Sequence, residues 1–164
     1  MSAAEASGNG RGGAPSEAAA AGLPPQQLAM VARPAAGSLP VVQIPAGYEL
    51  RTYRPGAEQG WAEVLAAAGF TDWTAQRCRD YMQEPTRRRG SHLVACAGQA
   101  VSVTFATPDA HDAAAGHLDY VATAPDHRGR RLGRAVCAAV MRFFLAEGRS
   151  TIRLATDDWR LPAI

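Results

Sequence analysis

The sequence predicts one α/β domain built on a mixed, mostly antiparallel sheet. Apolar residues alternate with a period of two in several short segments and recur with helical spacing in others, which indicates strands interleaved with helices. Near the C-terminus a strand at 117–123, a helix at 131–147 and a strand at 151–156 follow one another. Such a unit forms a right-handed crossover between two parallel strands. A length of 164 residues favours a single domain.

The first forty residues differ from the rest in composition. Residues 1–40 are rich in Ala, Gly, Pro and Ser and contain no aromatic residue. Such a segment cannot bury enough apolar surface to offset the entropy lost on ordering. We therefore expect a disordered tail at 1–40 and a folded domain at 41–164.

The middle of the chain supplies the remaining elements. The segment "YELRTYRP" alternates as a strand, and helices are predicted at 57–69 and 71–82. The second helix carries Trp73, Tyr81 and Met82, which we expect in the core. The segment "EPTRRRGSH" is predicted to be a solvated basic turn, with the binding of an anionic ligand as the minor alternative. Two strands joined at Ala97-Gly98-Gln99 then form a hairpin, so the strands before the crossover are expected to be antiparallel.

Composition excludes several classes of protein. The net charge is only +2, which argues against a protein built to coat nucleic acid. The chain has no lysine, so no Schiff-base lysine is available. Its three cysteines are far apart and form no CxxC pair, which favours reduced thiols over a disulfide framework or a zinc site. The sequence lacks a signal-peptide pattern and a long apolar run, so we expect a cytoplasmic protein and no membrane association.

The segment "PDHRGRRLGRAV" at 125–136 carries most of the functional argument. It links the strand ending at Thr123 to the following helix. The first N–H groups of a helix have no intrahelical acceptor and lie at the positive end of its dipole, which favours a bound phosphate. Gly129 and Gly133 allow a ligand to approach the main chain, and four arginines add positive charge. A simple solvated helix start is the plainer alternative.

The stretch "YVATAPDHRGRRLGRAV" resembles the cofactor segment of the GCN5-related N-acetyltransferase (GNAT) family, whose core is [R/Q]-x-x-G-x-[G/A]. Arg128 matches the first position and Gly133 the last, and the resemblance covers roughly 48–164. It implies the acyl-CoA N-acyltransferase fold, acetyl-CoA as co-substrate, and acyl transfer to an amine after a base removes a proton. The implied cofactor-binding residues are Val121, Ala122, Thr123, Arg128, Gly129, Arg130, Arg131, Leu132, Gly133 and Arg134.

Two features depart from the family pattern. Arg131 occupies the position of the central glycine, which costs about 1–2 kcal/mol if the backbone there has a positive φ and little if it is helical. The sequence ends at "TDDWRLPAI", so we expect the family's last strands and its acid tyrosine to be missing. We also expect the strand at 151–156 to present an unpaired edge. Whether the chain is a fragment, an early-terminated gene product or a chain completed by a partner is left open.

Acyl transfer to an amine needs a general base. The candidates are His117 and Asp119, which the period-two rule places on the same face as Val121 and Thr123. For both, a polar residue that faces solvent at the start of a strand is an equally good interpretation. Asp157 and Asp158 follow the last strand, where helix capping is favoured over catalysis. No metal-ligand cluster stands out.

Three functional hypotheses follow. The leading one is an acyl-CoA-dependent N-acyltransferase that acts on a small-molecule or peptide amine. The second is a catalytically incomplete CoA-binding or interaction module. The third is a nucleic-acid binder that joins Arg87–Arg89 to the arginines of 128–134. The sequence does not identify the acceptor, and a homo-oligomer remains open.

Overall fold

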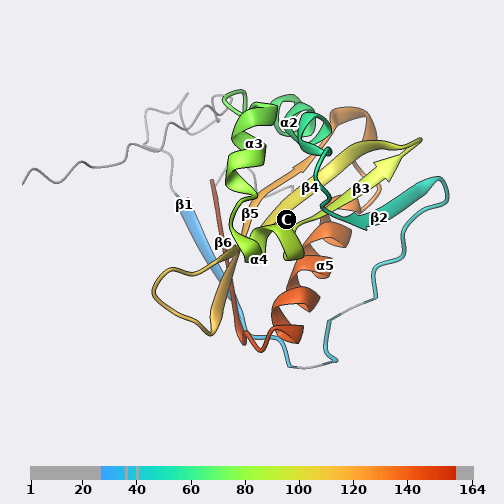
Figure 1. Cartoon of the computed structure of the whole chain (residues 1–164). Coiled ribbons are helices and arrows are strands. Elements are labelled where there is room, and N and C mark those ends of the chain that lie inside the picture. Colours follow the sequence, from blue (N-terminus) through green and yellow to red (C-terminus); the bar gives the residue numbers. More distant parts are fainter. Residues whose placement is uncertain (1–26, 36, 40, 158–164) are drawn as a thin grey trace, which may run out of the picture.

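The computed structural model describes residues 27–35, 37–39 and 41–157. In this part of the chain six strands form one sheet in the order β1-β6-β5-β4-β3-β2, as Figure 1 shows. The β5–β6 pair is parallel and the four other pairs are antiparallel. The prediction of a mixed, mostly antiparallel sheet is therefore confirmed. The strands are β1 (Gln27–Ala32), β2 (Tyr48–Thr52), β3 (His92–Cys96), β4 (Gln99–Pro108), β5 (Ala115–Thr123) and β6 (Thr151–Asp157).

Helices cover both faces of the sheet (Figure 1). The helices α2 and α3 close one face over a core that includes Trp61 and Phe105, both fully buried. The helix α5 closes the other face through Leu132, Val136 and Phe144, which recur at helical spacing. The helices are α2 (Glu58–Ala67), α3 (Ala75–Tyr81), α4 (Pro85–Gly90) and α5 (Leu132–Ala146), and a short 3-10 helix, η1 (Pro125–His127), precedes α5.

The expected hairpin and crossover are both present. The β3–β4 turn has a positive φ at Ala97 (49°) and at Gly98 (83°), which is the backbone twist that tight hairpins require. The unit β5–α5–β6 is the predicted parallel crossover. Trp73 and Met82 are buried as expected, whereas Tyr81 is half-buried and uses its hydroxyl group.

The N-terminal prediction is wrong in part. Residues 27–32 form β1, which pairs antiparallel with β6 from Gln27↔Asp157 to Ala32↔Ile152. The segment 151–156 is therefore not an unpaired edge, because β1 lies on one side of β6 and β5 on the other. Composition did not reveal β1 because its stability comes from pairing with a strand more than a hundred residues away. The rest of the predicted tail, residues 1–26, lies outside the described residues.

The predicted basic turn at 84–92 is also wrong, because residues 85–90 form the short helix α4. The carboxylate of Glu84 accepts hydrogen bonds from the N–H groups of Thr86 and Arg87, and Pro85 occupies the first turn. An N-cap followed by proline is a helix-start signal that the charge of the arginines obscured. Within the described ranges, no helix has the length and apolar character needed to cross a membrane.

Candidate functional site

A bulge interrupts β5 near its C-terminal end. Phe105 of β4 lies opposite Asp119, but Val103 lies opposite Ala122. Two residues of β5, Tyr120 and Val121, therefore lie opposite a single residue of β4, Thr104. Tyr120 has a φ of 52°, in the left-handed region that a bulky side chain rarely adopts. Such strain in a strand is a feature that clusters at functional sites.

Two buried hydroxyl groups of β4 stabilise the bulge. Thr104 Oγ1 donates to the carbonyl oxygen of Asp119 at 3.1 Å, and Ser102 Oγ donates to that of Ala122 at 3.0 Å. Both side chains are fully buried. They give hydrogen bonds to carbonyl groups on each side of the bulge, where the regular ladder is interrupted. In the sequence, the two polar residues of "VSVTF", Ser102 and Thr104, were a signal for this irregular strand pairing.

The bulge changes which residues share a face of the sheet. Asp119 contacts Tyr81 of α3, so it lies on the face covered by α2 and α3. Val121 and Thr123 lie beside Gly133 on the face covered by α5. The prediction that these two residues share a face with Asp119 is therefore wrong, because the extra residue at the bulge shifts the alternation by one.

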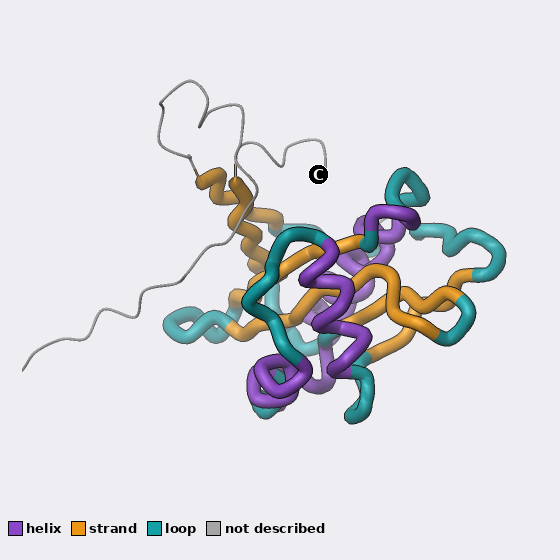
Figure 2. Tube along the Cα trace, turned by 90° about the horizontal axis from the view of Figure 1, so that it is seen from above, coloured by secondary structure: helices purple, strands orange, loops and turns teal. Residues whose placement is uncertain are grey.

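The strands β5 and β6 separate before the bulge. Only three residue pairs join them, from Ala115↔Thr151 to His117↔Arg153. Further along, β6 continues to Asp157 with β1 as its partner, and β5 continues to Thr123 with β4 as its partner. Figure 2 shows the β1–β6 ribbon projecting away from the rest of the sheet. Among the residues that the structure describes, the C-terminal half of β5 thus has no strand on its β6 side.

The start of α5 presents backbone N–H groups beside this opening. The residue before the helix, Arg131, has φ 61° and ψ 20°, and no side chain caps the helix. The Ala135 N–H donates to the Arg131 carbonyl group, so the three preceding N–H groups, from Leu132 to Arg134, have no acceptor within the helix. Of the two cases considered from the sequence, the backbone at Arg131 has the positive φ that suits a glycine. Arg131 therefore bears the steric cost of a non-glycine residue in the left-handed region.

Gly133 lies in the first turn of α5 and faces β5. A Cβ added there would lie 3.6 Å from Thr123 Oγ1 and 3.8 Å from Val121 Cγ1, which are ordinary contact distances. Packing therefore does not require glycine at this position, although glycine costs a helix about 0.8–1.0 kcal/mol relative to alanine. A glycine at position 133 is explained if a ligand lies against the main chain there, because a side chain would occupy that space.

Positive charge surrounds the same helix start. The side chains of Arg128, Arg130, Arg131 and Arg134 are all exposed. The preceding turn is braced against β2, because Tyr48 Oη lies 2.9 Å from His127 Nδ1 in a hydrogen bond. The Arg130 guanidinium lies 6.0 Å from the centre of the Tyr48 ring. Arg128, Arg130 and Arg131 therefore lie in an anchored turn and Arg134 lies in the first turn of α5, all near the unpaired N–H groups.

The comparison with known proteins agrees with this geometry. Residues 56–164 match the model of the acetyltransferase (GNAT) family. The chain belongs to the GNAT family. It is 30% identical over 144 residues to the mycothiol acetyltransferase of Thermobispora bispora, which covers 80% of this chain and 48% of that protein.

Solved GNAT structures share the fold. The GCN5-related N-acetyltransferase from Sphaerobacter thermophilus aligns with a TM-score of 0.70 and 20% identity, over 82% of this chain and 43% of that one. A GCN5-related N-acetyltransferase from Kribbella flavida aligns with a TM-score of 0.56 and 26% identity, over 80% and 48%. The chain thus spans about half the length of these relatives.

Asp119 has a defined environment in this GNAT domain. Its Oδ2 accepts a hydrogen bond from Tyr81 Oη at 3.0 Å. Burial first, and then the negative charge of Asp119, raise the pKa of Tyr81 to about 12. Tyr81 was expected only as a core residue, and a tyrosine at the end of a half-buried helix gave no sign of its carboxylate partner.

His117 lies in a different environment, at the start of β5. Its Nε2 is 2.8 Å from Asp109 Oδ2, and Arg153 of β6 pairs with the same oxygen. The backbone N–H of His111 and then the His117 side chain hold the pKa of Asp109 well below its usual value. His117 thus belongs to an ion-pair cluster where β5 and β6 begin. Asp157 ends β6, and Asp158 lies outside the described residues.

The two arginine groups do not form one surface. Arg89 pairs with Glu147, just beyond the C-terminal end of α5, at 2.8 Å. The arginines of 128–134 lie at the other end of this 15-residue helix, about 22 Å away at 1.5 Å per residue. The single basic patch required by the nucleic-acid hypothesis is therefore absent from the described residues.

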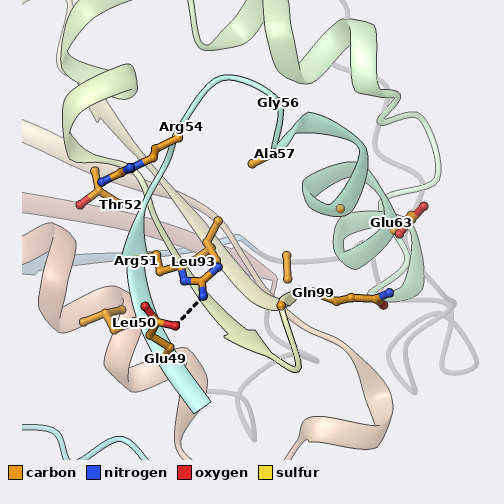
Figure 3. A pocket seen from close by; sticks show the side chains of 13 residues that line it. Glu49, Leu50, Arg51, Thr52, Arg54, Gly56, Ala57, Glu63, Leu93 and Gln99 are labelled. Atoms are coloured by element: carbon orange, nitrogen blue, oxygen red, sulfur yellow. Dashed lines mark hydrogen bonds and ion pairs between the residues drawn. The ribbon is translucent and has the colours of Figure 1, made fainter. Parts of the chain in front are cut away.

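A hollow in the surface lies away from the residues described above. It has a volume of about 810 Å³ and lies between β2, the start of α2 and the β3–β4 turn. Figure 3 shows its rim, where Glu49 and Arg51 pair with each other, and its floor at Leu93. We assign it no chemistry, because its charged lining is exposed. Among the described residues, no group of three His, Cys, Asp or Glu side chains is arranged to hold a metal ion.

Proposed function

We propose that this chain transfers an acetyl group from acetyl-CoA to an amine. The observation that carries the proposal is the uncapped start of α5, where free N–H groups lie beside Gly133, a glycine that packing does not require. Membership of the GNAT family supports it. The relatives named above include an enzyme that is a mycothiol acetyltransferase, and the acceptor proposed here is an amine of unspecified class.

The residues present fit acetyl-CoA. The N–H groups of Leu132, Gly133 and Arg134 suit a pyrophosphate, because they combine free donors with the positive end of the helix dipole. Arg128, Arg130, Arg131 and Arg134 supply charge that does not depend on pH. The main chain of Val121, Ala122 and Thr123 borders the opening between β5 and β6, which suits an extended arm that carries amide groups.

Asp119 is the proposed general base. When bound, acetyl-CoA supplies an acetyl thioester, whose C–S bond breaks with release of the CoA thiolate as the bond to the amine nitrogen forms. Asp119 accepts the proton that the acceptor ammonium must lose before its nitrogen can attack. His117, the other candidate, is less suited to this role because its Nε2 is already paired with Asp109.

The two reactants would reach the bulge from opposite faces of the sheet. The cofactor-binding residues Val121 and Thr123 face α5, whereas Asp119 faces α2 and α3. A donor that lies along α5 would therefore not occupy the Asp119 side of the sheet, where the acceptor is proposed to bind. The three cysteines are free thiols, which supports the cytoplasm as the compartment.

The first test is a thermal melt of the chain with and without acetyl-CoA. We expect a cooperative transition that rises with ligand concentration, because a ligand at a hundred times its Kd adds about 2.7 kcal/mol to the unfolding free energy. A panel of amines is then scanned for release of CoA thiol. Release with at least one amine supports the enzyme. A ligand-dependent melt without release from any amine supports the non-catalytic CoA-binding module instead, and a melt indifferent to acetyl-CoA contradicts both.

A further inference from the structure

The hydroxyl group of Tyr81 links three elements on the face of the sheet that α2 and α3 cover. It donates to Asp119 Oδ2 on β5 at 3.0 Å and lies 3.2 Å from Thr107 Oγ1 on β4. Tyr81 is itself the last residue of α3. A phenol in this position fixes one carboxylate oxygen of Asp119, and the other oxygen then takes a single orientation.

The Tyr81 ring is held from several sides. Its centre lies 4.9 Å from the ring centre of Phe105 and 5.3 Å from that of Trp73, both in edge-to-face contact. The Arg87 guanidinium carbon lies 3.8 Å from the Tyr81 ring centre. Each contact limits rotation of the ring, so the hydroxyl group is pre-organised where it meets Asp119.

Arg87 is held in turn by its own hydrogen bonds. Its Nε donates to Thr107 Oγ1 at 3.2 Å, and its Nη1 donates to the Tyr81 carbonyl oxygen at 3.4 Å. Thr107 is therefore shared between Tyr81 and Arg87. This short chain of contacts explains why Arg87 points into the fold, unlike Arg88 and Arg89, whose side chains are exposed.

From these contacts we propose that Tyr81 is a positioning residue, which acts through Asp119 by holding its carboxylate in the orientation that accepts the acceptor's proton. The inference rests on the proposed function, since it assigns a partner to the proposed base. The charged and titratable groups near this pair include Arg87 of α4, which lies over the Tyr81 ring, and two residues of β5: Tyr120, whose ring centre is 6.5 Å from that of Tyr81, and His117, which is already paired with Asp109.

The chain contains a matched control. Tyr53 is buried and donates to Glu58 Oε1 at 2.6 Å, so it is a second tyrosine paired with a carboxylate. That pair ties the end of β2 to the start of α2 and takes no part in the proposed site. Tyr81→Phe and Tyr53→Phe remove the same hydroxyl group from the same kind of pair, so a general loss of packing affects both.

The experiment compares the wild type with both variants by two readouts. The first is the carbon-13 NMR chemical shift of the Asp119 carboxyl group at one fixed pH, assigned with Asp119→Asn, which needs no acceptor. The second is the pair of constants kcat and KM for acetyl transfer to an amine found in the panel. In Tyr81→Phe we expect the chemical shift of the Asp119 carboxyl group to change, because the variant loses the hydrogen bond to Asp119 Oδ2.

The same variant should lower kcat about tenfold with little change in KM for acetyl-CoA, whereas Tyr53→Phe should change neither the Asp119 chemical shift nor kcat. An Asp119 chemical shift that is unchanged in Tyr81→Phe would overturn the inference. A kcat loss of equal size in both variants would overturn it too, because it would indicate a general packing effect. A wild type that transfers acetyl to no amine contradicts the proposed function instead, and the chemical shift still decides whether Tyr81 acts on Asp119.

Discussion

At its first residues, its closed end, β5 is paired on both sides, whereas at its last residues, its open end, the described part of the chain pairs with it on one side only. The start of the strand has β4 and β6 as neighbours, and His117 there is tied to Asp109 and Arg153. The end of the strand bulges at Tyr120 and leaves β6. Polar groups at the start are paired within the fold, whereas the first N–H groups of α5, next to the end, have no acceptor within the helix.

Two glycines, one at the start of β5 and one next to its end, differ in whether packing requires them. A Cβ added to Gly116, at the start of β5, would lie 2.5 Å from the Phe144 ring, so packing excludes a side chain there. A Cβ added to Gly133, next to the end of β5, would meet its neighbours at 3.6 Å or more. One glycine thus serves the core. The other has no such structural role, and this makes it the stronger marker of a binding site.

The largest expected effect is on ligand binding at the open end. Gly133→Leu should weaken CoA binding by roughly ten- to a hundredfold, about 1.4–2.8 kcal/mol, because its side chain would occupy the space beside the N–H groups. Titration calorimetry with CoA measures it. The control, Gly133→Ala, should keep or raise the melting temperature, since alanine is the better helix former. Equal CoA affinity in Gly133→Leu and the wild type would remove the proposed cradle.

At the closed end the corresponding change should affect stability. Gly116→Ala should lower the free energy of unfolding by about 1–3 kcal/mol, because the added methyl group forces the Phe144 ring to move. Urea unfolding measures the loss. CoA affinity of the folded variant should stay within twofold of the wild type. A variant as stable as the wild type would show that the core around Phe144 yields easily.

The ion-pair cluster at the closed end should appear in the pH dependence of stability. The pKa of Asp109 in the fold lies below its unfolded value near 3.8, so its stabilising effect is present above pH 4 and is lost as the pH falls further. The stability of the wild type should therefore fall more steeply below pH 4 than that of Asp109→Asn. Urea unfolding between pH 2 and pH 6 measures this, with the exposed Asp126→Asn as control. Parallel curves for the wild type and Asp109→Asn would contradict the role of the cluster.

The smallest effect is expected at Arg131, where the open end carries strain. Arg131→Gly should raise the free energy of unfolding by about 0.5–1 kcal/mol, because relief of the left-handed backbone outweighs the added freedom of the unfolded chain. Arg130→Gly is the matched control, since Arg130 is not among the residues with a positive φ. It should bring no gain. A loss of stability in Arg131→Gly would mean that the arginine side chain contributes more than the strain costs.

Local patterns in the sequence were enough for most of the elements. Periodicity located α5 and the hairpin, and the motif at 125–136 located the helix start. The short helix α4 was missed although its start signal is local, and the other features that periodicity missed were non-local or irregular. β1 depends on a partner far along the chain, and the bulge at Tyr120 moves Asp119 to the opposite face from Val121. The partnership of Asp119 with Tyr81 depends on both the bulge and the packing of α3, so no local pattern could reveal it.

The short contact between β5 and β6 also bears on how the molecule moves. Three residue pairs are a narrow connection for a ribbon in which β1 and β6 pair over six residues each. In amide hydrogen exchange, such a ribbon should open as a unit of its own, before the four strands from β2 to β5. A ligand that fills the gap would connect the two parts, so part of its binding energy would appear as slower exchange along β6.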